Sequence, residues 1–595
     1  MAIQDAEVLA ANYQVQTELL SKGIQSKLWE ECLSNSDFRS LHLRLKSFCN
    51  SWFLSSEYVD FSSYQGLSFG KAISNYLAYD LESWVRIAAI FESIGILDRD
   101  VDLYVPNRGY FPSVVYDYVE RIELHYNCKI SIRSLEIEDL GLESSVAHVV
   151  SQRRCTSELK RSSRSTTIAL LDWLKKFITQ RKSSSVRCLV VRIRNSGEYF
   201  SRDEMQKNQG LHLFFDTHYF VQRRMFFDDL RSHRLTFLDK EMTTNGFAGE
   251  ETFRLQFQLA LDSLHDCLAS SLGLNSLGHE FILNLVRPYL DDAMDEQMKR
   301  FQYLSRQCAE NKINATICDG PDSPESHYCR HLMTERKGTS YFVPHGLIRK
   351  DQTLEPWRGD LADIYFYYTE SLKGQLSKQY SINENRFHSL RFLSTVSSAP
   401  KLTETASHSV LILLDNFQVA LISRINYFGY LQKVIEIFRT NGVSNITVRL
   451  SQTFLRHYHK SRVSEEDQVR YFAGVTIQYP AELQLESVIS DYDIVIGPLT
   501  TCILEAILHR TFFIPFIPDY FLHEESRASA TMQWMPELYP DISSNFDQLQ
   551  EVVSSFVMDP TREQRKYEQS IEAIGLCMEK TESIVAIVSK NRNLT

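Results

Sequence analysis

Apolar and polar positions follow two periodicities along the chain, one typical of helices and the other of buried strands. Residues 1–50 have the helical period, which predicts an amphipathic helical segment that packs on the main body. Apolar and aromatic positions recur at helical spacing again up to residue 94, after a glycine-containing turn at 64–70. The run DLYVP (102–106) then predicts a strand, a helix follows, and CKISIRSL predicts the next strand. The succession of strand, helix and strand is the pattern of a parallel sheet.

The middle of the chain continues this pattern after an interruption. Residues 150–187 are the most polar and basic part of the sequence and surround one apolar helix, TTIALLDWLKKFI. Strands are predicted on either side of a long helical tract at 250–312, by the runs VRCLVVRIR (186–194), LHLFFDT (211–217), NATIC (314–318) and SYFVPHG (340–346).

A second α/β unit begins near residue 408. SVLILLD (409–415) and SNITVRLS (444–451) have the pattern of buried strands, and the helix between them ends on a glycine. Residues 483–517 then give helix, strand, turn, helix and strand. Two βαβ sets, one on each side of residue 400, predict an α/β fold of two Rossmann-like domains that face each other across a cleft, with additional helices.

This pattern divides the chain into four predicted parts. They are an N-terminal helical segment (1–50), a first Rossmann-like domain (51–400), a second, nucleotide-binding one (401–560) and a C-terminal helix (561–595). Helices predicted over 546–590 could cross back to the first domain, which spacing alone does not decide.

Composition narrows the function. A chain of 595 residues is too long for one hydrophobic core, and a formal net charge of −11 argues against a broad nucleic-acid-binding face. The eleven cysteines are scattered singly without metal-ligand spacing, which disfavours a zinc site and favours a reducing compartment. No signal peptide and no apolar run of about 20 residues is present. We therefore expect a cytoplasmic protein without nucleic-acid partners.

The strongest local signal is DYDIVIGPLTTCILEAILHR (491–510). A buried strand ends at Gly497, and Thr500 and Thr501 begin a helix that carries Glu505. A helix N-terminus presents unpaired N–H groups and a positive dipole end, which suit a donor phosphate. The alternative is a simple helix N-cap by threonine.

Two further signals follow strands of the first unit. FVPHGLIRKD (342–351) places His345 and Gly346 at the carboxyl end of a strand, where α/β proteins bind ligands. Asp319 follows the strand NATIC directly, and a carboxylate there could attack an anomeric carbon, act as a base or bind a sugar hydroxyl. The alternatives are a structural histidine and an Asx-turn before the next helix.

Weaker candidates complete the set. Arg449 and Ser451 end the strand ITVRLS, and the arginine could pair with the donor phosphate or take part in a surface salt bridge. Glu250, at the start of the long helix, is either a favourable first-turn charge or a catalytic base. Motifs of NTPases, dehydrogenases, hydrolases and zincins are absent from the sequence, and no DxD-type doublet predicts an obligate metal.

Together these segments resemble a family of bacterial surface-polysaccharide glycosyltransferases. The likeness rests on the Asp319 turn before a helix, the strand ending in His345-Gly346, the arginine-bearing strand of the second domain and DYDIVIGPLTTCILEAI. VDFSSYQGLSFGKAISNYLAY is similar to the start of these enzymes' first domain. Relatives include CMP-Kdo-dependent transferases, bacterial sialyltransferases and CDP-glycerol glycerophosphotransferases, and the resemblance covers about 250 residues in blocks.

The resemblance implies the GT-B fold and a cytidine-nucleotide donor without a cofactor or an obligate metal. His345 and the helix start at Thr500 and Thr501 would hold the donor phosphate, and Glu505 would bind the ribose. In the retaining β-Kdo branch a cleft aspartate is the nucleophile, and Asp319 fits that position best. Arg449-Leu450-Ser451 stands where many relatives have Arg-x-His-Pro, which leaves the donor sugar and the anomeric outcome open.

The sequence thus predicts an enzyme that moves a nonulosonate, first of all Kdo, from a CMP-activated donor to a growing capsule or O-antigen glycan. Its partners would be this donor, a glycan or lipid-linked glycan acceptor and, peripherally, the inner membrane or an assembly complex. Three alternatives stay open: a GT-B transferase with a UDP-hexose, GDP-hexose or CDP-glycerol donor, a non-catalytic GT-B scaffold, and a nucleotide-sugar epimerase.

Overall fold

The computed structural model describes part of the chain, and the structural account below is limited to that part. The described residues are 6–11, 13–33, 35–55, 59–97, 99–105, 110–135, 186–191, 208, 210–216, 235–238, 250–318, 323–343, 362–370, 373–374, 377, 381–390, 408–414, 424–451, 463, 465–480, 485–497, 502–516, 546–574 and 583–590.

A small parallel sheet begins the chain, in the order β2-β1-β5-β6. Its strands are β1 (Glu7–Ala10), β2 (Lys27–Leu28), β5 (Val101–Val105) and β6 (Ile130–Ser134), with α1 (Tyr13–Ser21), η1 (Trp29–Cys32) and α4 (Ser113–Tyr126) between them. The expectation of a wholly helical 1–50 is therefore wrong for β1 and β2. Four apolar-rich residues become a strand here because β5, far along the chain, supplies their pairing.

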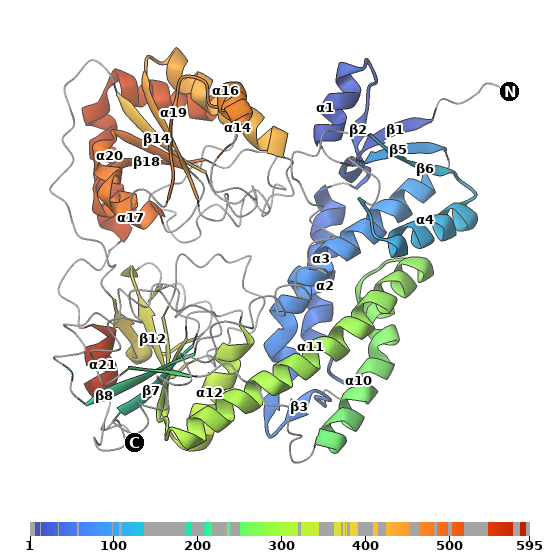
Figure 1. Cartoon of the computed structure of the whole chain (residues 1–595), viewed down its shortest axis with the longest axis vertical. Coiled ribbons are helices and arrows are strands. Elements are labelled where there is room, and N and C mark those ends of the chain that lie inside the picture. Colours follow the sequence, from blue (N-terminus) through green and yellow to red (C-terminus); the bar gives the residue numbers. More distant parts are fainter. Residues whose placement is uncertain are drawn as a thin grey trace.

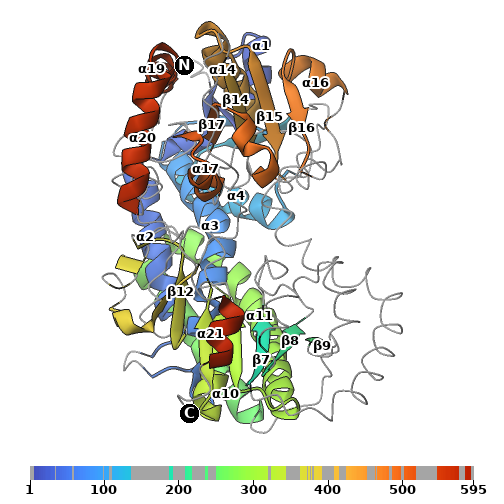
Figure 2. The ribbon, with the colours of Figure 1, turned by 90° about the vertical axis from the view of Figure 1, so that its left-hand side faces the viewer.

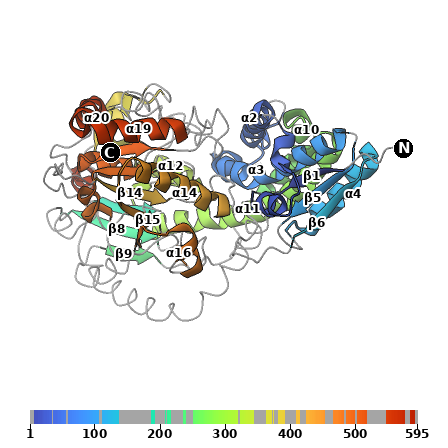
Figure 3. The same ribbon diagram turned by 90° about the horizontal axis from the view of Figure 1, so that it is seen from above.

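A layer of helices lies beside this small sheet (Figure 1). It contains α2 (Asn35–Ser51), α3 (Phe69–Ile96), α10 (Glu250–Ser271) and α11 (Ser276–Glu310), and a two-stranded hairpin of β3 (Ser63–Tyr64) and β4 (Leu67–Ser68) precedes α3. The Ser68 hydroxyl caps α3 by accepting from the backbone N–H of Lys71. Seen from above, the small sheet and α4 lie at one end of the molecule, away from the C-terminal unit (Figure 3).

The first large sheet has seven parallel strands in the order β13-β12-β11-β10-β7-β8-β9. They are β7 (Val186–Val191), β8 (Leu211–Asp216), β9 (Leu235–Leu238), β10 (Ala315–Cys318), β11 (Thr339–Phe342), β12 (Ile364–Tyr367) and β13 (Phe387–Ser389), with α12 (Pro324–Arg336) after β10 and η4 (Glu384–Arg386) before β13. The strand order reverses between β7 and β10. This reversal is the topological switch point, outside which open α/β sheets bind ligands.

The second large sheet is also wholly parallel, in the order β16-β15-β14-β17-β18, and reverses between β14 and β17. Its strands are β14 (Ser409–Leu414), β15 (Asn445–Leu450), β16 (Thr476–Gln478), β17 (Ile494–Gly497) and β18 (Phe512–Pro515). The helical elements of this unit are α14 (Arg424–Thr440), α16 (Glu465–Tyr471), η6 (Leu485–Ser487), η7 (Ile489–Asp491), α17 (Cys502–Leu508), α19 (Phe546–Met558) and α20 (Pro560–Ile574).

The last helix, α21 (Ile584–Lys590), leaves the C-terminal unit and contacts β8 of the first large sheet (Figure 2). In Figure 1 the arrowhead of β12 points toward the C-terminal unit, and α17 lies on the side of that unit that faces the lower sheet. Two parallel sheets with Rossmann-like strand order and added helices confirm the predicted α/β fold class.

Candidate functional site

A row of four residues crosses the C-terminal sheet near the carboxyl ends of its strands. Leu413 on β14 is in register with Arg449 on β15, and Arg449 with Gln478 on β16. Gly497 on β17 lies on the other side of Leu413. Residues in register project to the same face of a sheet, so the four residues of this row lie side by side on one face.

Arg449 is the charged member of this row and is only 8% exposed. Its Nη1 donates a hydrogen bond of 2.6 Å to the Gln478 side-chain oxygen. Burial lowers the pKa of the Arg449 guanidinium, and the neighbouring Cys502, Glu505 and Tyr492 act in the opposite direction. An arginine keeps its proton under these conditions, so the row places a desolvated cation near the strand ends, where an anionic ligand would be stabilised.

The close approach of Leu413 explains why position 497 is a glycine. A Cβ added there would lie 2.9 Å from the Cβ of Leu413, closer than side-chain carbons pack. Ser451, which follows β15, donates its backbone N–H to Leu414 O at 3.1 Å and extends the ladder by one residue. The structure therefore brings four predicted residues, Arg449, Ser451, Gly497 and Glu505, to one region of the C-terminal sheet.

Five other predicted site residues lie outside the described residues, namely Asp319, His345, Gly346, Thr500 and Thr501. Their convergence on one groove stays a prediction. Glu250 is the first residue of α10, a helix that packs against α2 and α11, and its side chain is likewise outside the described part.

The first large sheet carries a charged cluster that the sequence analysis missed. Asp216 ends β8, Arg300 lies in α11 and Glu325 lies in the first turn of α12, and their exposed fractions are 5%, 4% and 2%. Arg300 pairs through Nη1 and Nη2 with the two carboxylate oxygens of Asp216, the first at 3.3 Å. Its Nε lies 3.5 Å from Glu325 Oε1. We call these three residues the Arg300 cluster.

Small polar groups surround the start of α12 beside this cluster. Ser326 Oγ lies 3.1 Å from Cys318 Sγ and 3.2 Å from Ser323 Oγ. At the next residue, burial and secondarily the charge of Lys71 lower the pKa of His327 to about 4. The imidazole is therefore neutral at physiological pH. Asp216 at the end of the run LHLFFD was the available sequence signal for this region, because a charge ending a wholly apolar strand needs a partner.

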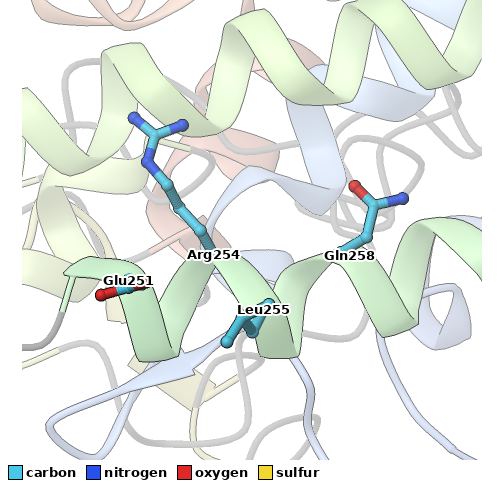
Figure 4. A pocket seen from close by; sticks show the side chains of 4 residues that line it. All are labelled: Glu251, Arg254, Leu255 and Gln258. Carbon is cyan, nitrogen blue, oxygen red and sulfur yellow. The ribbon is translucent and has the colours of Figure 1, made fainter.

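A surface hollow lies elsewhere, on the outer side of α10 (Figure 4). It is lined by Glu251, Arg254, Leu255 and Gln258, all from one helix face. Arg254 points toward α11 and pairs with Asp295 at 2.9 Å. The hollow brings together no groups from a sheet edge, so it offers no catalytic arrangement. Among the described residues, no His, Cys, Asp or Glu side chains form a group of three that could hold a metal.

Comparison with known proteins gives only structural likenesses. No family model and no curated protein matches the chain. The apo lipopolysaccharide outer core galactosyltransferase WaaB is similar at 10% identity and a TM-score of 0.36, over 66% of this chain and 96% of that chain. A variant of the wall teichoic acid polymerase TagF is similar at 8% identity and a TM-score of 0.37, over 75% and 98%.

A third similar structure is the Methanocaldococcus jannaschii UDP-GlcNAc 2-epimerase in complex with UDP-GlcNAc and UDP. It shares 10% identity at a TM-score of 0.37, over 65% of this chain and 98% of that chain. Scores this low carry no argument about activity, which has to come from the residues. Within the described part of the chain, every helix is too short or too polar to cross a membrane.

Proposed function

We propose that this chain is a GT-B glycosyltransferase that binds a nucleotide-sugar donor at the carboxyl edge of the C-terminal sheet and an acceptor at that of the first large sheet. The observation that carries the proposal is Arg449, a buried cation near the strand ends that donates a hydrogen bond to the Gln478 side-chain oxygen. A buried cation beside a topological switch point suits the phosphate of a nucleotide.

The donor we propose is a CMP-activated nonulosonate, first of all Kdo, and the acceptor a growing surface glycan. CMP leaves from the anomeric carbon, and Arg449 with the helix start at Thr500 and Thr501 would stabilise the negative charge that develops on its phosphate. This arrangement needs no metal. His345 would donate to the same phosphate, Glu505 would bind the ribose, and Asp319 would either form a glycosyl adduct or position the acceptor.

Thermal-shift measurements with CMP, CDP, UDP and GDP test the donor. A ligand that binds only the folded state adds about 2.7 kcal/mol of stability at 100 times its Kd. We expect CMP to raise the Tm most. If UDP or GDP raises the Tm more than CMP does, the donor is a hexose nucleotide. If CDP raises it most, the donor is CDP-glycerol. If no nucleotide raises the Tm, the chain is a non-catalytic scaffold.

Two arginine variants of the same domain locate the site. Arg449→Gln is expected to abolish the CMP shift, whereas Arg439→Gln is expected to keep it. Arg439 is exposed in the last turn of α14, donates to Ala473 O at 2.6 Å and precedes β15, so it lies at the opposite edge of the sheet. Equal CMP shifts in both variants would remove Arg449 from the donor site. Intact turnover in Asp319→Asn would remove the catalytic role of Asp319.

A further inference from the structure

The Arg300 cluster joins three separate elements inside the N-terminal half of the molecule. Asp216 comes from the last position of β8, Arg300 from the middle of α11 and Glu325 from the start of α12. All three side chains are almost wholly buried. The guanidinium therefore connects two carboxylates that lie far apart in the sequence.

The charges of this cluster do not balance. One guanidinium faces two carboxylates, and Glu325 Oε2 is buried without a hydrogen-bond partner in the described part of the chain. Moving charged groups out of water costs several kcal/mol per ion, so such a cluster is a poor source of net stability. The cluster instead fixes geometry, because a planar guanidinium sets the angle and distance of the carboxylates that it holds.

The cluster spans the switch point of the first large sheet. In the sheet order, β7 lies between β8 and β10. Asp216 marks the carboxyl end of β8, and α12 is the element that follows β10. Arg300 thus holds one chain segment on each side of the position where a ligand of this sheet would bind.

We propose that Arg300 is a positioning residue for the acceptor side of the transferase, which sets the place of the β8 end and of the α12 start relative to each other. The inference rests on the proposed function. Through Glu325 the guanidinium also fixes the start of α12, where the buried Ser323 and Ser326 hydroxyls lie 3.2 Å apart. A lysine at this position keeps the charge but cannot hold two carboxylates in one plane.

The test compares Arg300→Lys with Arg287→Lys. Arg287 lies in the same helix and pairs with the exposed Asp262 at 2.8 Å, so its variant controls for the loss of a guanidinium from α11. For Arg300→Lys we expect transfer to the acceptor to fall about 10- to 100-fold, because small misplacements cost that much. We expect the Kd for CMP, measured by thermal shift, to stay within about two-fold of wild type, because the donor site lies in the other domain. Arg287→Lys should match wild type in both.

Hydrogen exchange of the backbone amides tests the role of Arg300 without a measurement of transferase activity. Faster exchange confined to peptides covering 211–216 and 323–336 supports positioning, whether or not the wild-type protein transfers a sugar. Unchanged exchange, or exchange that rises throughout the chain together with a loss of CMP binding, overturns it. A wild type without transfer activity contradicts the proposed function alone, and the exchange pattern then decides the role of Arg300.

A second variant covers the case in which Arg300→Lys fails to fold. Glu325→Gln keeps the pair between Arg300 and Asp216 and removes the surplus negative charge. We expect this variant to fold, with faster exchange at the start of α12 and unchanged exchange at the end of β8. If exchange changes by the same factor in both segments, or in neither, relative to wild type, the proposal is overturned.

Discussion

The two large sheets share one topology and differ in the charge near the carboxyl ends of their strands. In the first, Arg300 faces Asp216 and Glu325, so one positive and two negative groups leave a formal charge of −1. In the second, Arg449 donates to the neutral Gln478, and the Glu505 carboxylate of α17 acts on its guanidinium. A shared strand order therefore does not give a shared ligand. Our proposal assigns the acceptor to the first edge and the anionic nucleotide to the second.

The small N-terminal sheet sharpens this comparison, since it too is parallel and reverses its order between β1 and β5. Aromatic side chains fill the space next to it. Trp29, which follows β2, packs against Phe91 of α3 with ring centroids 5.7 Å apart and against Phe111 at 5.4 Å. The side chains near a switch point, more than the strand order, determine whether it can bind a ligand.

The largest effect is expected from removal of the two arginines. Arg300→Leu leaves two buried carboxylates without their cation, which costs about 3–5 kcal/mol of unfolding free energy. Arg449→Leu leaves a buried neutral amide, which costs about 1–3 kcal/mol. Urea unfolding of both variants measures the difference, and equal costs would contradict the charge contrast between the two edges.

The next largest effect is a pH dependence of the unfolding free energy, which arises outside both large sheets. Glu92 of α3 accepts from the backbone N–H of Asn275 at 3.1 Å, and burial raises its pKa to about 7 from the ordinary value of 4.5. The folded state binds this proton more tightly than the unfolded state, so stability falls as pH rises from 4.5 to about 7 and then levels off. Glu92→Gln keeps an acceptor and is expected to gain up to about 3 kcal/mol at pH 8 and nothing at pH 4.

Glu280, on α11, provides the control for this variant. Its hydrogen bond with Arg121 lowers the pKa of the Glu280 carboxyl, which is the opposite direction, so Glu280→Gln should gain no stability at pH 8. Urea midpoints at pH 4, 6 and 8 measure both. A constant difference between Glu92→Gln and wild type over this range would show that Glu92 does not titrate as expected. CMP binding should be unchanged in both variants.

A smaller effect is expected from Gly497→Ala in the C-terminal row. The added methyl group meets the Leu413 Cβ at 2.9 Å, and overpacking of this kind costs about 1–3 kcal/mol. Gly374→Ala is the matched control, because nothing lies within 4 Å of a Cβ at that position. We expect calorimetry to show a lower Tm for Gly497→Ala than for Gly374→Ala. The affinity for CMP should fall only in Gly497→Ala. Equal Tm values would mean that the row tolerates a side chain.

The smallest effect is expected at the surface hollow. Arg254 and Asp295 form an exposed ion pair, and pairs of this kind contribute about 0–1 kcal/mol. Arg254→Ala should therefore change the urea midpoint little and leave CMP binding unchanged. A loss comparable to that of Arg300→Leu would show that burial does not explain the difference between these arginines.

The sequence predicted those strands whose apolar runs are long enough to indicate a strand without information from other parts of the chain. VRCLVV, LHLFFD, SVLILL and NITVRL all form strands at the expected places. It missed β1 because EVLA has only four residues, and its pairing with β5 depends on a distant part of the chain. Short strands depend on partners that local periodicity does not contain.

The same limit applies to the sites. Gly497 was predictable because a glycine ending a buried strand indicates close approach, and the structure gives that contact with Leu413. Arg300 was not, because it lies in a helix with many charged residues, and only the packing of β8 and α12 against it reveals its burial. The donor-binding roles of Arg449, Ser451, Gly497 and Glu505 stay predictions.

The return of α21 to β8 restricts how the two Rossmann units can move. The chain passes between them once after β13 and once more before α21, whose Ile584, Val585, Ile587 and Val588 are buried. The two units are therefore joined twice by the chain. Separating them would require α21 to leave its buried place against β8, which would expose these four apolar side chains to water.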